Sequence, residues 1–359
     1  MLRRIGAAIG IAVCMALVVK EMPAQRNKKK YEEPKPQILP LPPNMPMALA
    51  TETASLDFHI SPLLKTGGLS AQIRRSLNDL IRDTHGETIV KLRAFVAGAG
   101  DARRVEAETG AIFSEHKLPL PVLTILQVGA LDDAAAQVVI EAVVSTPRAA
   151  NPNGLAFIAG QHGATLRDAF ENMKRATSAA TVAPDHLLRM TCFTSRIQDY
   201  EATRASVLNI FPKVAFNLVQ AVRDPRGDSS MCEAVGQLSQ PPAQGEVVWL
   251  SEARATLVNS RQLVFTGMQL TFGSFLDDAH QAFLRLHRAA SALQPVEVPV
   301  QVNAFSLNVY AGSALIKTTS FPQSTFTVQT VEGLPAVDAS AGIEAILAPN
   351  VKAPATAPE

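Results

Sequence analysis

Three glutamates stand at corresponding places in three similar stretches of the sequence. Glu141 lies in VVIEAVV, Glu233 in MCEAVGQL and Glu344 in GIEAILA, and alanine follows each glutamate. The β-branched and apolar residues of these stretches predict strands. Repeated carboxylates could mark three equivalent ligand clefts, or they could pair with a neighbouring Lys or Arg at the rim of a sheet. We favour the second, structural role and keep all three as ligand-cleft candidates.

Two of the three cysteines, Cys192 and Cys232, lie on predicted strands near the second of these glutamates. They could form a disulfide in an oxidising compartment or remain two buried thiols, and the sequence leaves both possibilities open. Neither cysteine has a His or Lys beside it, so we expect no catalytic thiol.

Metal and cofactor motifs are absent from the sequence. His280 and His287 lie seven residues apart on a predicted helix, which misses the four-residue spacing of a helical metal pair. His162 follows Gly160 and Gln161 at a strand end, where we expect a structural or solvated side chain. There is no P-loop, GxSxG or HExxH sequence. We therefore expect no metal and no cofactor.

The same elements surround each glutamate in the same order. A predicted helix is followed by a strand holding a phenylalanine, then by a strand that begins at a proline, and finally by the glutamate strand. Apolar residues at three- and four-residue spacing predict the helices, and near-alternation predicts the strands. The helices cover 71–83, 166–177 and 276–293, the phenylalanines are Phe95, Phe193 and Phe305, and the prolines are Pro121, Pro212 and Pro322. This order predicts three copies of one α+β unit.

Helices on one face of each sheet leave the other apolar face without a partner. Three tandem copies can cover these faces for one another, so we expect the chain to close on itself as a monomer. The units are predicted at 51–146, 153–240 and 246–348, with joints rich in Pro, Asn, Gln and Gly between them.

The N-terminus is predicted to lie outside these units. Arg3 and Arg4 precede an uncharged, almost wholly apolar run over 5–19. Because this run is short for a membrane span, we predict a signal peptide at 1–24 rather than an N-terminal anchor. The protein should then be exported, periplasmic or secreted, and would contact a membrane only through an uncleaved N-terminal segment. Residues 25–50 are predicted to be a Pro-rich linker and 349–359 a disordered tail.

Composition limits the classes of partner. Among the 359 residues, 47% are hydrophobic and 18% are charged, which is typical of a folded globular protein. The net charge of +1 and the aromatic share of 5% argue against a protein that wraps nucleic acid or stacks on its bases. We expect no nucleic-acid partner.

Several stretches resemble the Rid/YjgF family of enamine and imine deaminases, which is related to chorismate-mutase-like trimers. In the first copy these stretches are QIRRSLNDL (72–80), IVKLRAFV (89–96), AIFSEHKLPLP (111–121) and VIEAVV (139–144). The second copy adds IAGQHG (158–163), and the third adds FTGMQ (265–269) and VEGLPAVDASAGIEAILA (331–348). The resemblance covers about residues 52–348 as three divergent copies.

The resemblance implies a β-β-α-β-α-β-β unit that trimerises with its sheets inward and with ligand clefts between neighbouring units. Three such units in one chain would form an intramolecular pseudo-trimer. The spacing from phenylalanine to proline is 26 residues in the first copy, 19 in the second and 17 in the third. The second helix should therefore be shortened, or replaced by a loop, in the later copies.

The resemblance also implies two site positions. In the family, an Arg just after the proline binds the substrate carboxylate, and a Glu in the last strand holds the attacking water. The Arg position is occupied here by Leu123, Val214 and Ser324, and the Glu position by Val139, Met231 and Gly342. Because all six are substituted, we do not expect hydrolysis of 2-imino acids by the family mechanism. Arg93 and Arg189, on the phenylalanine strands, are expected at a sheet edge or in solvent, where they would not replace the lost Arg.

We therefore expect an exported Rid-like protein that binds a small carbonyl or imine metabolite in its inter-unit clefts. One alternative is an active hydrolase of the 2-imino acid deaminase type, with a site rebuilt on the post-proline strands. Another is a structural or partner-binding module whose clefts bind nothing. The candidate cleft residues are Thr124, Gln127, Glu141, Gly160, Gln161, Glu233, Gly267, Thr325, Gln329 and Glu344.

Overall fold

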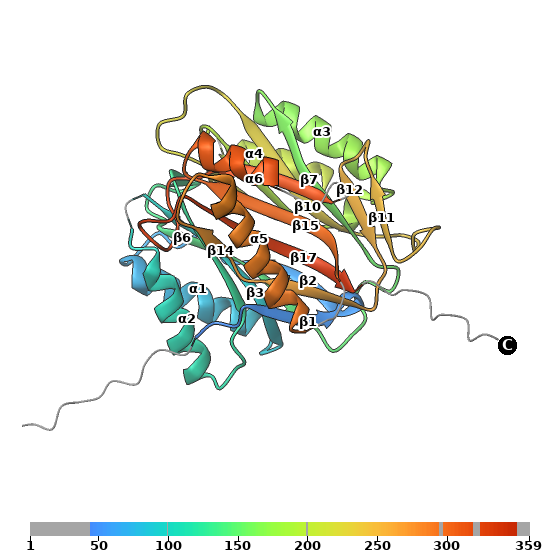
Figure 1. Ribbon diagram of the computed structural model, residues 1–359, viewed down its shortest axis with the longest axis horizontal. Helices are drawn as coiled ribbons and strands as arrows, with labels where there is room; N and C mark the ends of the chain where they lie inside the picture. Colours follow the sequence, from blue (N-terminus) through green and yellow to red (C-terminus); the bar gives the residue numbers. More distant parts are fainter. Residues whose placement is uncertain (1–43, 99, 199, 294–296, 319–323, 350–359) are drawn as a thin grey trace, which may run out of the picture. The chain divides into compact units, whose positions relative to one another are not determined.

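The computed structural model describes residues 44–98, 100–198, 200–293, 297–318 and 324–349 (Figure 1). The predicted signal peptide, most of the predicted linker and nearly all of the predicted tail lie outside these residues. The end of the predicted linker is an exception, because Ala48–Glu52 form a strand that is paired along its whole length. The linker prediction was therefore wrong at this end.

The described residues form a mixed α+β fold with several sheets. The helices are α1 (Leu69–Asp83), α2 (Arg103–Glu115), α3 (Leu166–Ala179), α4 (Tyr200–Ile210), α5 (Leu276–Ser291) and α6 (Val309–Thr318). The strands are β1 (Ala48–Glu52), β2 (Leu56–Ile60), β3 (Thr88–Ala97), β4 (Val122–Val128), β5 (Ala130–Leu131), β6 (Val138–Ser145), β7 (Leu155–Gly163), β8 (Leu187–Thr194), β9 (Ala215–Gln220), β10 (Ser230–Gln237), β11 (Val247–Leu250), β12 (Ala255–Val258), β13 (Gln262–Thr266), β14 (Gln269–Thr271), β15 (Glu297–Ser306), β16 (Thr325–Thr330) and β17 (Ala341–Pro349).

The strands form three sheets that share one central arrangement. Their orders are β2-β6-β3-β4, β11-β12-β7-β10-β8-β9-β5 and β1-β13-β17-β15-β16, and β14 also pairs with β17. In each sheet a parallel pair (β3-β4, β8-β9 or β15-β16) lies beside an antiparallel glutamate strand (β6, β10 or β17). The similar stretches of the sequence therefore occupy matching places in three sheets.

Each sheet is covered on one face by two helices. Ile73, Leu77 and Leu80 of α1 lie on one side of that helix and are buried against β3, β4 and β6, as their three- and four-residue spacing predicts. Similar cores join α3 and α4 to the second sheet, and α5 and α6 to the third. The second helix of each pair shortens from 13 residues in α2 to 11 in α4 and 10 in α6. The predicted shortening is confirmed, and no loop replaces the helix.

The other faces of the three sheets pack against one another. One core cluster combines Phe58 of β2, Phe157 of β7 and Phe265 of β13. A second cluster contains Phe95, Phe193 and Phe305, all fully buried, with ring centroids 5.9 Å apart for the first two and 6.4 Å apart for the last two. The apolar faces that the helices leave free are thus buried between the sheets.

Several strands cross the predicted unit boundaries. β1 precedes the first sheet in the chain but pairs with β13 of the third. β12, within the predicted third unit, extends the second sheet by pairing with β7, and β11 pairs with β12. β5, within the predicted first unit, pairs with β9 of the second sheet. Sequence segments and sheets therefore do not coincide at their edges, because a short strand pairs with whichever sheet edge lies nearest in space.

Cys192 and Cys232 form a disulfide between directly paired positions of β8 and β10. Both are fully buried. Of the two possibilities that the sequence left open, a disulfide or two buried thiols, the structure has the disulfide.

None of the described helices combines the length and the apolar composition that a membrane-spanning helix requires.

Candidate functional site

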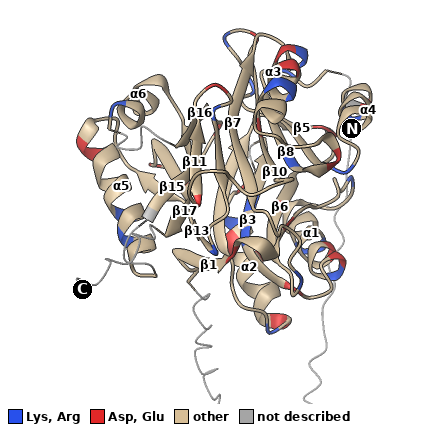
Figure 2. Cartoon of the chain, turned by 90° about the vertical axis from the view of Figure 1, so that its right-hand side faces the viewer, with Lys and Arg blue, Asp and Glu red and all other residues tan. Residues whose placement is uncertain are grey.

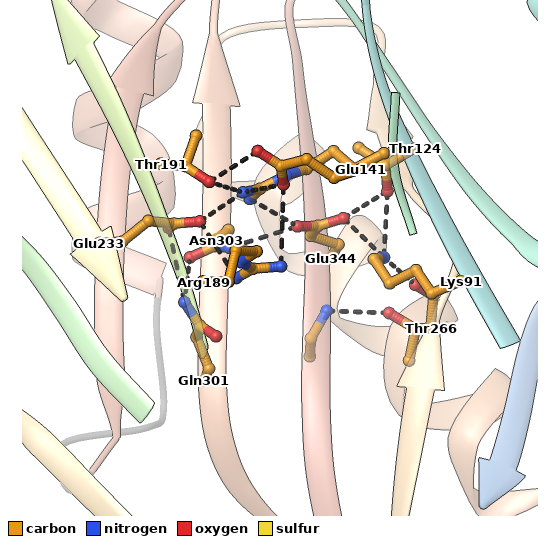
Figure 3. Close-up of polar contacts among 12 residues, drawn as sticks. Lys91, Thr124, Glu141, Arg189, Thr191, Glu233, Thr266, Gln301, Asn303 and Glu344 are labelled. Atoms are coloured by element: carbon orange, nitrogen blue, oxygen red, sulfur yellow. Dashed lines mark hydrogen bonds and ion pairs between the residues drawn. The ribbon is translucent and has the colours of Figure 1, made fainter. Parts of the chain in front are cut away.

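The three repeated glutamates meet at the centre of the protein. Glu141, Glu233 and Glu344 lie with Lys91, Arg93 and Arg189 in what we call the central charge cluster (Figure 3). Every member is at most 6% exposed. Figure 2 shows that charged residues otherwise lie largely on the helices and loops. The prediction of a rim position for the glutamates was wrong, and so was the prediction of edge or solvent positions for the arginines.

Arg93 contacts all three carboxylates, one from each sheet. Its Nη2 lies 2.8 Å from Glu141 Oε2 and 2.6 Å from Glu233 Oε1, and its Nη1 lies 3.6 Å from Glu344 Oε1. Thr191 donates a hydrogen bond to Glu141 (2.6 Å), as does Asn217 (2.7 Å). A planar guanidinium with five donors suits this role, because it can bond several carboxylates at once.

Lys91 neutralises the third carboxylate. Its Nζ lies 2.7 Å from Glu344 Oε2 and donates to Thr266 O at 2.8 Å. Thr124 also donates to Glu344. Arg189 stands farther off, 3.7 Å from Glu141 and 3.6 Å from Glu233. Three cations therefore balance three carboxylates.

Burial and ion pairing shift the pKa values of these groups in opposite directions. Burial alone would raise the pKa of Glu344, but Lys91 and Arg93 outweigh it and hold that pKa at about 2. Burial would likewise raise the pKa of Glu141, and Arg93 and Arg189 hold it below its usual value. Burial lowers the pKa of Lys91 despite Glu344. Glu141 and Glu344 are thus held in their charged form.

The central charge cluster has no room for a ligand. The free space between its side chains is about 10 Å³, roughly that of one water molecule. Glu141, Glu233, Glu344 and Thr124 were predicted as candidate cleft residues, but they serve the interior network instead. The interpretation of the glutamates as three separate clefts is wrong, because they converge on one site.

A cavity of about 680 Å³, which we call cleft 1, lies between the first and second sheets. Val139 of β6 and Val214, just before β9, both line it. These are the residues at the Glu position of the first copy and the Arg position of the second. Two site positions taken from different copies therefore line one cavity, and both are apolar.

The strand pairing refines the Arg positions. Leu123 pairs with Leu92, and the corresponding residues of the other ladders are Phe216, paired with Met190, and Phe326, paired with Val302. Counting from the proline gave Val214 and Ser324 instead, because the later strands begin farther from their prolines. Phe216 also lines cleft 1. No Arg stands at the position under either alignment.

Charged residues line one side of cleft 1. They are Asp132 and Asp133 after β5, Glu201 and Arg204 on α4, and Lys65 in the loop before α1. Lys65 pairs with Asp133 at 2.8 Å. Partial burial, followed by the charges of Glu201 and Asp133, raises the pKa of Asp132 to about 6. A carboxyl group titrating near neutral pH in a cavity is typical of a functional site.

A second cavity of about 810 Å³, cleft 2, lies between the second and third sheets. Met231 of β10 lines it together with Gln329 of β16, His162, Arg226 and Tyr310. Partial burial and the charge of Arg254 lower the pKa of His162, so this imidazole is neutral near pH 7. Gln329 is the one predicted cleft residue that lines either of these two cavities.

Neither of the two clefts lies between the third and first sheets, where side chains approach two glycines closely. A Cβ atom on Gly342 would lie 2.6 Å from Met268 Sδ, and a Cβ atom on Gly333 would collide with Gln127 Oε1. Gln127 also exchanges backbone hydrogen bonds with the segment at Gly333 and donates to Gly98 O. Gln127 therefore packs against the segment at Gly333 and lines neither cleft 1 nor cleft 2.

The remaining predicted residues have structural partners. Thr325 donates to Val300 O, and Gln161 donates to Ala159 O and Ala253 O. Gly160 donates to Thr327 Oγ1, and a Cβ there would collide with Met231 Sδ. Gly267 donates to Met47 O. These residues hold strands together and line neither cleft.

Sequence reasoning missed the charged side of cleft 1. Asp132 and Asp133 were visible as adjacent carboxylates after a strand, but nothing in the sequence places them near Glu201. That juxtaposition depends on how α4 of the second copy packs near the first sheet. No group of three or more His, Cys, Asp or Glu residues in the described part of the chain is arranged to hold a metal ion.

Comparisons with known proteins identify no family. No protein-family model matches the chain, and no curated protein matches it. Among solved structures, a chorismatase is 12% identical with a TM-score of 0.23, covering 83% of this chain and 99% of its own. PurL from T. maritima, complexed with FGAR, is 7% identical with a TM-score of 0.26, covering 81% of this chain and 72% of its own. A cyanuric acid hydrolase from A. caulinodans is 9% identical with a TM-score of 0.20, covering 85% of this chain and all of its own (100%). At these TM-scores the likenesses establish neither fold nor activity.

Proposed function

We propose that this chain is an exported Rid-like protein that closes as an intramolecular pseudo-trimer and binds a small carbonyl or imine metabolite between its units. The observation that carries the proposal is the lining of cleft 1. Val139, at the Glu position of the first copy, and Phe216, at the strand-aligned Arg position of the second, line the same 680 Å³ cavity, and Val214 also lines it. A volume of this size is typical of small-molecule sites.

The convergence of equivalent residues supports the pseudo-trimer. Phe95, Phe193 and Phe305 pack in one cluster, and the three glutamates meet around Arg93. The pairing of β1 with β13 joins the start of the described chain to the third sheet, as a ring closed within one chain requires. The buried disulfide supports export, because disulfides persist mainly in oxidising compartments.

The geometry favours binding of the ligand over hydrolysis of it by the family's mechanism. Cleft 1 has Val139 where the family has its Glu, and at the Arg position it has Phe216 by strand pairing or Val214 by counting from the proline. Arg93 and Arg189 are buried in the central charge cluster and bonded there, so neither can hold a substrate carboxylate in the cleft.

The proposal is tested by blocking cleft 1. Leu63 lines the cleft from the loop after β2, so Leu63→Trp should fill its opening. The matched control is Leu284→Trp, the same change at an exposed leucine of α5. Binding of butanone, 2-oxobutyrate, butyramide and butylamine would be followed by ligand-observed NMR. We expect at least one of them to bind the unmodified chain and the control but not Leu63→Trp.

Two results would contradict this function. No binding by any of the four compounds would favour the purely structural module. Binding that persists in Leu63→Trp would remove the assignment to cleft 1. The alternative of an active deaminase is checked in parallel by generating a 2-imino acid in situ, and we expect no acceleration of its hydrolysis over the uncatalysed rate.

A further inference from the structure

Cleft 1 contains a carboxylate whose charge nothing in the protein balances directly. Asp132 is half-buried and takes part in none of the hydrogen bonds or ion pairs among the described residues. Its neighbour Asp133 is already paired with Lys65. A partly desolvated carboxylate without a partner is unfavourable, and a ligand cation would relieve it.

The surroundings of Asp132 add negative charge. Glu201, in the first turn of α4, lies on the same cavity wall and raises the pKa of Asp132 further. Counting all charged lining residues, Asp132, Asp133 and Glu201 oppose Lys65 and Arg204, which leaves a net charge of −1. An anionic ligand would therefore be repelled from this wall.

A buried hydrogen-bond acceptor lines the same cleft. Asn217 is 4% exposed and donates its Nδ2 hydrogen to Glu141, whereas its Oδ1 accepts no hydrogen bond from any described residue. Apart from Ser61, the remaining lining residues are apolar and include Ile60, Val139 and Leu218. A ligand that fits has an apolar body and a nitrogen that donates hydrogen bonds.

We infer that cleft 1 recognises a cationic nitrogen, an amine or a protonated imine on a small apolar body, through Asp132 and Glu201. This inference rests on the proposed function and names the ligand group that the site selects. A site built on an Arg recognises an anionic group. Cleft 1 has no Arg at that position and is lined by carboxylates, so the group that it recognises is cationic.

The test compares three compounds of the same size that differ in charge. Butylamine is a cation near neutral pH, butyramide is neutral and butyrate is an anion. Affinities would be measured by titration calorimetry at pH 7.5 on the full chain, on Asp132→Asn and on Asp338→Asn, which changes an exposed aspartate outside both clefts. We expect butylamine to bind most tightly, and Asp132→Asn to weaken it about tenfold or more, as loss of a charged hydrogen-bond partner does. Asp338→Asn should leave its affinity unchanged.

The pH dependence gives a second readout. Asp132 is faced by Glu201, Asp133, Lys65 and Arg204, and its pKa of about 6 in the free protein means that it gains a proton below that pH. Butylamine affinity should therefore fall as the pH decreases from 7.5 to 5, and this fall should be smaller in Asp132→Asn.

The outcomes separate this inference from the proposed function. Equal or tighter binding of butyrate or butyramide, lost in Leu63→Trp, would overturn the cation preference and leave cleft 1 as a binding site. Butylamine affinity that is unchanged in Asp132→Asn would also overturn it. Binding of none of the three compounds would overturn the cation preference, and the proposed function would fail with it only if butanone and 2-oxobutyrate do not bind either.

Discussion

At the residue scale, the same chemical group, a carboxylate, occurs in two opposite environments. Glu141 and Glu344 are fully paired in the interior, where Arg93 contacts both. Asp132 is only half-buried and stands without a direct partner. Buried charges persist in proteins when they are paired, so an unpaired one signals a site that a ligand completes.

The unpaired carboxylate should reduce the stability of the free protein. The folded-state pKa of Asp132 is about 6, above the ordinary value of 3.8, so the folded state binds the proton more tightly. Stability is therefore lost as the pH rises from about 4 through 6. Asp132→Asn should raise the melting temperature at pH 7.5, and the gain should vanish below pH 4. Melting curves of this variant that show no gain at pH 7.5 would contradict the burial of an unbalanced charge.

The central charge cluster predicts the reverse behaviour for Glu344. Its folded pKa of about 2 lies below the usual 4.5, so its stabilising effect is present above pH 4.5 and is lost as the pH falls through 2. Glu344→Gln leaves Lys91 without its carboxylate and should lower the free energy of unfolding at pH 7 by about 3–5 kcal/mol. Urea titrations would measure this. The double change Lys91→Met with Glu344→Leu should recover part of the loss, and no recovery would argue against an electrostatic cause.

At the scale of elements, periodicity predicted the helices and strands well. The ranges 71–83 and 166–177 are helical, and 276–293 is helical as far as Ser291, because their apolar positions fall on one face of each helix, which the sheets bury. The edge strands that pair with the sheet of a neighbouring segment were not predicted. Nothing in the sequence of β11 and β12 says that they join the second sheet, where β12 pairs with β7, since strand pairing depends on which edge lies nearby. The central charge cluster was not predicted for the same reason, because Lys91, Arg93 and Glu344 meet only after the three sheets have packed together.

The disulfide between β8 and β10 gives a prediction at this scale. It joins residues 40 positions apart. Under denaturing conditions without reductant, a thiol assay of the full chain should find one reactive thiol, that of Cys14, and three after reduction. Replacing Cys192 and Cys232 by Ala should lower the free energy of unfolding by about 2–4 kcal/mol, because the unfolded chain gains freedom. Three thiols before reduction would contradict the pairing.

At the scale of the whole molecule, three sheets bury their inner faces on one another within a single chain. The clusters that contain Phe58, Phe157 and Phe265, and Phe95, Phe193 and Phe305, bury the inner faces of the described sheets against one another. Both clefts are lined by residues of this one chain.

The most direct test of the account is the mass of the protein in solution. If one chain supplies all three units, sedimentation equilibrium should give one chain, 38.3 kDa for the full sequence, at every concentration examined. The mass should stay the same for Leu284→Trp, which changes an exposed leucine of α5 and not the packing of the sheets. A stable species of three chains would contradict the account, because the units of one chain would then not complete the ring by themselves.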